Sequence, residues 1–572
     1  MLLYNYLLLQ YGGKPKWTIL HHNGPLFPPS YKPHNIPVII NNKEYVLTDL
    51  AEEYATMYVK YLNTEYINNI RFKKNFWKDF KKILNDKNNS INISNINSLD
   101  DIDFTPIQEY LKNNNNKIIL NSDEKEEIER KEEPYKYCYI DGIKQNIGNY
   151  RIEPPGIFIG RGNHPKTGHI KKRIRPEDIT LNLSKDASIP KPSISESSKW
   201  AKIIHDRDVI WLASWTENVT GKTKYIFTST DSFFKSKSDE EKFDLARKLK
   251  KKVTSIRETY EEQLLDKNMK NRQLATALYL IDNLALRVGN TKDTKEKADT
   301  VGVLSLRVEH ITLLDSNDNL DSKDNDNLDS NDNLNSNDNN LVSKSNKKHN
   351  MIKLDFLGKD SIRFCKKIQV SELVYNNIKL FSDPNSKNKK SLLFDLITPT
   401  LLNNYLNDFM PNLTSKVWRT YNASYLFQKE IDKIKLNPKL DPEERLNYLL
   451  SMFNHANTEV ALLCNHQKGV VSKMDNIINK YNDKIKKYKK SIIGKTGDKV
   501  KKIKTKIKIL KIKRDLKTKN VSLGTSKNNY IDPRIIFAFL KKNNIDKDKL
   551  FLTKTMLKRF EWAKNVDENF RF

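Results

Sequence analysis

Residues 468–520 limit the possible folds of this chain more than any other segment, because they combine very high positive charge with helical apolar spacing. The segment holds 20 Lys and Arg residues against 4 Asp and Glu residues. Its apolar side chains form two stripes on either side of Gly494 and Gly497: Ile477, Ile478, Tyr481, Ile485 and Tyr488, then Val500, Ile503, Ile507 and Leu510. This spacing predicts a Lys-rich antiparallel helical hairpin. Such a hairpin is either a solvated arm or an arm that lies over nucleic acid, and we favour the second because its like charges need a counter-charge.

The whole chain has the same excess of positive charge, with 101 Lys and Arg residues against 71 Asp and Glu residues and a formal net charge of +30. Self-repulsion on this scale favours a polyanionic partner, and nucleic acid fits better than a membrane surface or an acidic protein.

The cysteines Cys138, Cys365 and Cys464 lie far apart, which argues against a disulfide framework or a zinc cluster and suits a reducing compartment. No run of about 18 apolar residues occurs, so we expect no membrane span. The apolar start lacks a basic leader and a cleavage site, so we do not expect a signal peptide.

Periodicity predicts a mixed α/β region followed by a mainly helical one. Expected strands cover 17–20, 38–40, 209–212, 225–227, 303–311, 351–357 and 361–368. Expected helices cover 47–66, a segment that begins at a capping box of Ser238 and Glu241, and a segment from Ala275 that stops at Gly289. Lys359 is expected at the tip of a hairpin, and the Asn/Asp/Ser-rich tract at about 315–350 is expected to be a disordered loop.

The common signatures of metal and nucleotide chemistry are missing from the sequence. There are no paired cysteines, no His-Glu-x-x-His motif, no Gly-rich phosphate loop that ends in Gly-Lys-Ser/Thr, and no Gly-x-Ser-x-Gly motif. Composition and periodicity therefore indicate a basic, multidomain nucleic-acid binder and do not specify its chemistry.

Six longer motifs add a resemblance. In order and approximate spacing, they are similar to the core of the eukaryotic DNA topoisomerase I family, and they cover 149–165, 284–290, 355–363, 416–424, 464–467 and 523–534. The resemblance extends over nearly the whole chain except the first dozen residues and the Asn/Asp tract. It implies a type IB DNA topoisomerase that relaxes supercoiled duplex DNA without ATP, through transient cleavage of one strand.

The resemblance assigns five catalytic roles. Tyr530 is implied as the nucleophile that holds the 3′ side of the broken strand as a phosphotyrosine. Arg287, Arg419 and His466 are implied around the scissile phosphate, and Lys359 as the general acid for the leaving 5′ oxygen. Forked guanidinium groups suit the charge that develops on non-bridging phosphate oxygens. Since these cations are fixed in the chain and the tyrosyl ester conserves the bond energy, we expect no metal and no cofactor.

The resemblance also implies residues that touch DNA or border the cleavage site. They are Arg161, Trp211, Lys224, Tyr225, Lys242, Asn290, Lys292, Thr300, Asp360, Ser361, Thr414, Lys416, Gln467, Thr525 and Asn529. Lys166 and Glu296 match residues on opposing lips of the family's clamp, so an ion pair between them could close it; the alternative is that either charge is merely solvated. Asn528 departs from the family, which usually has an apolar residue there.

The implied architecture is an α+β, multidomain DNA clamp. It has a mixed α/β N-terminal jaw (1–232), a mainly helical catalytic domain (233–467), a Lys-rich coiled helical linker (468–520) and a small C-terminal domain (521–572). Double-stranded DNA is the expected partner of a monomer in the nucleus, and we expect no long charged N-terminal extension of the kind common in the family. A tyrosine recombinase, which uses the same catalytic residue types, and a non-enzymatic chromatin protein remain the alternatives.

Overall fold

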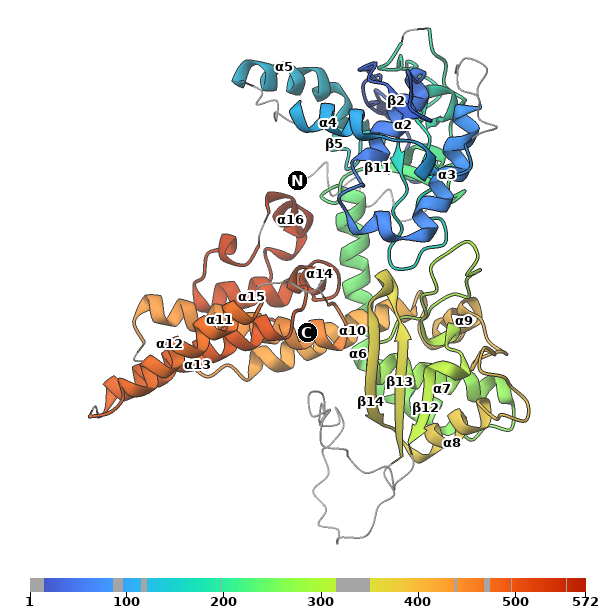
Figure 1. Ribbon diagram of the computed structural model, residues 1–572. Coiled ribbons are helices and arrows are strands. Elements are labelled where there is room, and N and C mark those ends of the chain that lie inside the picture. Colours follow the sequence, from blue (N-terminus) through green and yellow to red (C-terminus); the bar gives the residue numbers. More distant parts are fainter. Residues whose placement is uncertain are drawn as a thin grey trace. The chain divides into compact units, whose positions relative to one another are not determined.

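The computed structural model describes residues 15–85, 96–114, 121–195, 197–314, 350–436, 440–467, 474–494, 496–551 and 553–572 (Figure 1). Contacts divide the chain into two compact units. The first comprises Met1–Lys237 and Lys292–Asp299, and the second comprises Ser238–Thr291 and Thr300–Phe572. The expected disordered tract lies outside the described residues, and the four-part domain division expected from the sequence stays a prediction.

The first unit consists of small sheets and short helices. Its strands are β1 (Leu20–His22), β2 (Val38–Ile40), β3 (Lys43–Tyr45), β4 (Tyr137–Ile140), β5 (Ile143–Asn146), β6 (Gly156–Ile157), β7 (Ile170–Lys171), β8 (Thr180–Asn182), β9 (Lys202–Ile204), β10 (Trp211–Thr216) and β11 (Thr223–Phe227). Its helices are α2 (Asp49–Val59), α3 (Ile70–Leu84), α4 (Thr105–Asn113), α5 (Ser122–Glu132) and the start of α6 (Phe233–Gln263). The two larger sheets have the strand orders β1-β4-β5 and β11-β10-β8-β9.

Two expectations for the first unit need correction. The strand expected at 17–20 is displaced to β1, because the amides of Thr18 and Ile19 donate to the Asp141 carboxylate at 2.9 and 2.7 Å instead of to a neighbouring strand. The helix expected over 47–66 ends at Val59. There the backbone turns tightly, and the Thr64 hydroxyl donates to the Tyr61 carbonyl at 2.7 Å, satisfying a backbone acceptor outside the helix. The antiparallel pair β10–β11 is confirmed, and its register joins Trp211 to Phe227.

The second unit is mainly helical around one antiparallel sheet. The sheet has the order β12 (Ile311–Leu314), β13 (Met351–Leu357) and β14 (Arg363–Gln369). Its helices are the rest of α6, α7 (Met269–Leu284), α8 (Glu372–Phe381), α9 (Pro399–Phe409), α10 (Ser415–Asp432), α11 (Pro442–Leu463), α12 (Met474–Lys490), α13 (Asp498–Thr518), α14 (Leu523–Asn529), α15 (Pro533–Asn543) and α16 (Lys554–Arg559).

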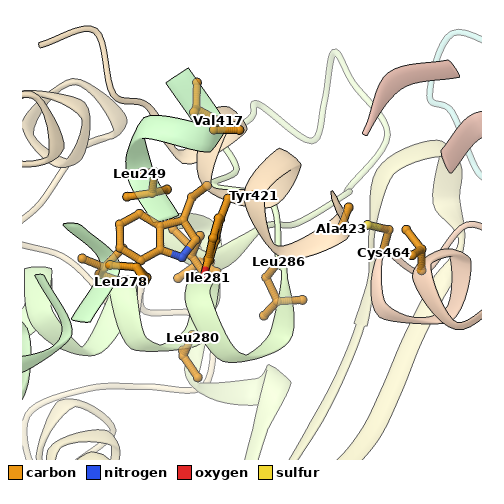
Figure 2. Packing of buried hydrophobic residues seen from close by; sticks show 14 of the residues in the cluster. Leu249, Leu278, Leu280, Ile281, Leu286, Val417, Tyr421, Ala423 and Cys464 are labelled. Atoms are coloured by element: carbon orange, nitrogen blue, oxygen red, sulfur yellow. The ribbon is translucent and has the colours of Figure 1, made fainter. Parts of the chain in front are cut away.

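The core of the second unit packs α6, α7 and α10 together. Figure 2 shows Leu249 of α6 beside Leu278 and Ile281 of α7, with Val417 and Tyr421 of α10 on the same cluster. The expected Lys-rich hairpin is confirmed in shape: α12 and α13 pack together, joined by a short connection (Figure 1). The hairpin of β13 and β14 is confirmed as well, and Lys359 lies in the turn at its tip.

The expected start of α6 is wrong. The helix begins at Phe233, so Ser238 and Glu241 lie inside it and form no capping box. Ser232 takes the capping position instead: its carbonyl accepts from the amide of Ser236 at 2.9 Å, and its hydroxyl accepts from the amide of Lys235 at 3.4 Å. Phe233 is buried in a core of the first unit, so packing extends the helix by a further turn.

Two further expectations are wrong, and the two segments that they concern lie next to each other. Helix α7 stops at Leu284 with Ala285 in the left-handed conformation, and does not continue to Gly289. The strand expected at 303–311 forms short 3-10 turns at Val303–Ser305 and Val308–His310, and β12 begins only at Ile311. Both differences have one cause, since the carbonyls of Arg287 and Val288 accept hydrogen bonds from the amides of Val303 and Leu304 at 2.9 and 2.7 Å.

Candidate active site

Arg419 lies on α10 and is buried with 4% of its surface exposed. One of its terminal nitrogens, Nη1, donates to the Tyr530 hydroxyl at 3.0 Å, and the guanidinium carbon lies 4.8 Å from the centre of the Tyr530 ring. The other terminal nitrogen donates to the Cys464 carbonyl at 3.4 Å. Its Nε atom is buried without a hydrogen-bond partner among the described residues.

Tyr530 follows the last residue of α14 and is half-buried. Its backbone is held on both sides, because its amide donates to the Ser526 carbonyl at 2.9 Å and its carbonyl accepts from the Ser424 hydroxyl at 2.9 Å. Asp532, fully buried, then caps α15 through the amide of Arg534 at 2.9 Å. The ring of Tyr530 is therefore fixed beside Arg419 by the chain on both sides of it.

His466 is the third residue after the end of α11, and Asn465 before it takes a positive φ of 52° and turns the chain. Its ring centre lies 5.3 Å from that of Tyr530. One ring nitrogen, Nδ1, lies 2.8 Å from the Ser526 hydroxyl, whereas Nε2 is buried without a partner in the described part of the chain. Burial, together with the smaller effects of the positive charges of Arg419, Arg287 and Lys359, lowers the pKa of His466 from 6.5 to about 3.

Arg287 reaches this cluster from the irregular segment after α7. Its place is set by a close backbone approach, since a Cβ added to Gly289 would lie 2.6 Å from the backbone of Gly302, and Gly289 has a φ of +74° that other residues rarely adopt. Burial and the positive charge of Arg419 lower the pKa of Arg287, while a hydrogen bond to the Tyr530 hydroxyl opposes this shift. The early end of α7 is thus what aims Arg287 at the tyrosine.

Lys359 is exposed in the turn between β13 and β14, where Asp360 and Ser361 have positive φ values of 66° and 60°. Its ammonium lies close enough to His466 to contribute to the lowered pKa of the imidazole. The structure therefore gathers Arg287, Arg419 and His466 at Tyr530 by packing. It places Lys359, on an exposed tip, within electrostatic reach of His466. Their individual catalytic roles stay predictions.

The expected DNA-contacting residues fall into both units. Within the second unit, Lys242 donates to the Asn529 carbonyl at 3.0 Å, beside Tyr530. The Gln467 side chain donates to Asn465 at 2.9 Å. The others in this unit are Asn290, Thr300, Asp360 and Ser361 near the hairpin turn or after α7, Thr414 and Lys416 at the start of α10, and Thr525 and Asn529 on α14.

Within the first unit, Trp211 and Tyr225 lie on β10 and β11 with ring centres 5.7 Å apart, next to Lys224. Arg161 and Lys292 belong to the same unit. So does the ion pair of Lys166 with Glu296, in which Lys166 also donates to the Val219 carbonyl at 2.9 Å. This contact ties the 292–299 segment to the first unit.

Sequence reasoning missed two residues that organise the site. Ser526 carries no signature of its own, although it lies inside the motif 523–534 and one helical turn before Tyr530. Asp282, 2% exposed on α7, accepts from Arg257 at 2.7 Å, from the Tyr260 hydroxyl at 2.9 Å and from Trp418 Nε1 at 2.9 Å. A buried acidic residue inside an apolar helix is a sequence signal of a structural role. It does not identify the partners of that residue, because they are far away in sequence.

Two absences concern the described residues alone. No group of three or more His, Cys, Asp or Glu side chains among them is placed to hold a metal ion. None of their helices combines the length and apolar character needed to cross a membrane.

Comparison with known proteins gives the same protein family in consecutive parts of the chain. The family model for the eukaryotic DNA topoisomerase I DNA-binding fragment matches residues 15–228, that for the catalytic core matches 231–499, and that for the C-terminal topoisomerase domain matches 498–572. DNA topoisomerase 1 of Caenorhabditis elegans is 40% identical over 96% of this chain and 66% of its own length. DNA topoisomerase 1 beta of Arabidopsis thaliana is 38% identical over 98% and 60%, and DNA topoisomerase 1 of Homo sapiens is 37% identical over 97% and 72%. The chain thus spans between 60% and 72% of the length of these three relatives. Matched along nearly its whole length by these proteins, the chain belongs to the eukaryotic DNA topoisomerase I family.

Proposed function

We propose that this chain is a type IB DNA topoisomerase that relaxes supercoiled duplex DNA without ATP. The observation that carries the proposal is a pair of buried nitrogens, Arg419 Nε and His466 Nε2, which lack partners in the described chain and belong to side chains packed against Tyr530. Buried polar nitrogens without a hydrogen-bond partner are rare because they cost free energy. An anion seated beside Tyr530 would supply the missing acceptors.

The scissile phosphate is the anion that fits this arrangement. Tyr530 Oη loses its proton to solvent, attacks phosphorus and forms a P–O bond as the bond from phosphorus to the 5′ oxygen breaks. Charge grows on the two non-bridging oxygens, where Arg287, Arg419 and His466 can donate hydrogen bonds. A proton from Lys359 goes to the leaving 5′ oxygen, and the 3′ end stays on Tyr530 as a phosphotyrosine.

Resealing is the reverse reaction. The 5′ hydroxyl attacks the phosphotyrosine, returns its proton to Lys359 and releases Tyr530, whose oxygen takes up a proton from solvent. One oxygen ester replaces another in each direction, so no nucleotide is needed to drive the exchange. Between the two steps the uncut strand allows rotation, which relaxes the supercoil.

Double-stranded DNA is the proposed partner, and basic or aromatic side chains of both units are the proposed contacts. In the first unit, Lys224, Arg161 and the ring pair of Trp211 and Tyr225 support this. The ion pair of Lys166 with Glu296 supports the expected clamp closure. We further propose that the protein acts as a monomer in the nucleus, in line with the family.

A plasmid relaxation assay without ATP tests the function. We expect the wild-type protein to relax the plasmid and Tyr530→Phe to lose this activity, because the phenylalanine lacks the attacking oxygen. Tyr139→Phe is the control, since Tyr139 is an exposed tyrosine on β4 of the first unit. Relaxation by Tyr530→Phe would exclude this nucleophile. No relaxation by the wild type would favour a non-enzymatic chromatin protein, and recombination products at a defined sequence would favour a tyrosine recombinase.

A further inference from the structure

Ser526 is fully buried on α14 and joins two parts of the candidate active site. Its hydroxyl lies 2.8 Å from His466 Nδ1. Its carbonyl accepts from the amide of Tyr530 at 2.9 Å and from that of Ile531 at 3.1 Å. One residue therefore contacts both the imidazole and the segment that carries the proposed nucleophile.

The hydrogen bond to Ser526 decides what the other side of the imidazole can do. Burial and the nearby cations hold His466 neutral, so the ring carries one N–H. If that proton is on Nδ1, the Nε2 atom faces the site as a lone pair and repels a phosphate oxygen. If it is on Nε2, this nitrogen is a donor to the phosphate, and Nδ1 must accept a hydrogen bond.

The Ser526 hydroxyl can supply that bond. In the described part of the chain, His466 Nδ1 is the one hydrogen-bond partner of this hydroxyl. A hydroxyl that donates to Nδ1 satisfies both groups and leaves the proton of the ring on Nε2, which is the buried nitrogen without a partner. With a phosphate bound at Arg419 and Arg287, the alternative tautomer would direct a lone pair at one of its oxygens.

We propose that Ser526 is a positioning residue of the cleavage reaction: its hydroxyl donates to His466 Nδ1 and so keeps the Nε2 proton directed at the scissile phosphate. The proposal rests on the proposed function, since it deepens the role of His466 at the same site. It assigns no direct contact with DNA to Ser526.

The main chain around His466 makes a clean test possible. The amide of His466 donates to the Ala461 carbonyl at 2.8 Å, and its carbonyl accepts from the Ser522 amide at 2.6 Å. These bonds do not involve the Ser526 hydroxyl, so Ser526→Ala leaves the histidine backbone in place. Ser451 offers a matched control, because it is 2% exposed on α11 and its hydroxyl donates to the Asn447 carbonyl at 2.7 Å.

Single-turnover cleavage of a labelled duplex by saturating enzyme gives the first readout. We expect Ser526→Ala to cleave about 5- to 50-fold more slowly, as loss of a buried hydrogen-bond partner predicts. Ser526→Thr keeps the hydroxyl and should stay near the wild-type rate, and so should Ser451→Ala. Thermal unfolding of each variant identifies any loss that comes from misfolding.

A double-mutant cycle separates a tautomer effect from a merely structural one. In His466→Gln the side-chain amide is a donor that has no tautomers, so adding Ser526→Ala should change the rate less than about twofold. The same loss in both backgrounds would overturn the proposal, because Ser526 would then act through packing. A wild-type rate for Ser526→Ala alone would overturn it as well.

Nitrogen-15 spectra of the histidine-labelled full chain give a readout that needs no activity. The signal of His466 is identified by its loss in His466→Gln. We expect the wild type to show a protonated Nε2 and an unprotonated Nδ1 at neutral pH, and Ser526→Ala to shift the Nδ1 signal. A protonated Nδ1 in the wild type would refute the proposal even if the protein relaxes DNA. The expected tautomer would stand even if Tyr530→Phe showed that the proposed function is wrong.

Discussion

Lys359 differs from the other proposed catalytic residues because it is exposed, at a hairpin tip, whereas Arg419 and His466 are buried. An exposed ammonium on a turn can approach or leave a bound strand without disturbing the core. It can serve either as a proton donor to the 5′ oxygen or as a fixed charge near the non-bridging oxygens. Its position alone is compatible with both roles, so the distinction must come from the leaving group.

Replacing the bridging 5′ oxygen of the substrate by sulfur distinguishes them. A thiol titrates near pH ~8.5, so a thiolate leaves without protonation. As general acid, Lys359 should contribute about 10²–10⁴ in rate. We therefore expect Lys359→Ala to be very slow on the ordinary strand and nearly normal on the sulfur-bridged one in single-turnover cleavage.

Two comparisons complete this experiment. Arg419→Ala should be slow on both substrates, because its oxygen partners are unchanged. Lys367→Ala, an exposed lysine on β14 of the same hairpin, should behave like the wild type. If Lys359→Ala lost the same factor in cleavage rate on both substrates, Lys359 would act only by stabilising charge.

Three helices converge on the carboxylate of Asp282. Arg257 and Tyr260 reach it from α6, and Trp418 reaches it from α10, next to Arg419. Asp282 itself lies five residues before Arg287. The acid thus links the two helices that carry or precede the proposed catalytic arginines. Its loss would remove the acceptor of the Trp418 indole N–H and the carboxylate that Arg257 and Tyr260 bind.

We predict that Asp282→Ala lowers the free energy of unfolding of the second unit by about 3–5 kcal/mol, as expected when one partner of a buried ion pair is removed. The cleavage rate should fall with it, since both arginines lose their fixed spacing. Calorimetry and single-turnover cleavage check the two effects. Asp408→Ala, at an exposed site on α9, should change stability by no more than about 0.5 kcal/mol. Equal stability of the two variants would refute the organising role of Asp282.

Sequence periodicity predicts the elements whose pattern is local. The strand 351–357 and the Lys-rich hairpin are right because alternation and helical stripes are written in the segments themselves. The end of α7 is wrong because it depends on hydrogen bonds from Val303 and Leu304, which local propensity does not contain. The five catalytic residue types came from the family resemblance, and Ser526 was missed because its importance comes from His466, sixty residues earlier.

The positive charge of the whole molecule is distributed over solvent-exposed lysines, and the α12–α13 hairpin holds many of them. Some of its lysines have protein partners: Lys506 pairs with Glu444 at 3.1 Å and Lys519 with Glu459 at 2.8 Å, both on α11. These contacts hold α13 and the residue that follows it against α11. Others are exposed on the hairpin, namely Lys486, Lys489, Lys501 and Lys504.

If the hairpin lies over DNA, these exposed lysines neutralise phosphates and release counterions when the complex forms. Each neutralised phosphate contributes a slope of about −0.9 to log K against log salt concentration. Changing the four exposed lysines to Gln should therefore make the slope shallower by up to about 3.6 while leaving the hairpin folded, because its apolar stripes are intact.

The control is a second four-Gln variant at exposed lysines of the same unit: Lys267, Lys270, Lys379 and Lys389. Binding measured by anisotropy over a salt series, with Tyr530→Phe present throughout to prevent cleavage, compares the two. The same slope in both variants would show that the hairpin contributes only the general charge of the molecule and makes no phosphate contacts of its own.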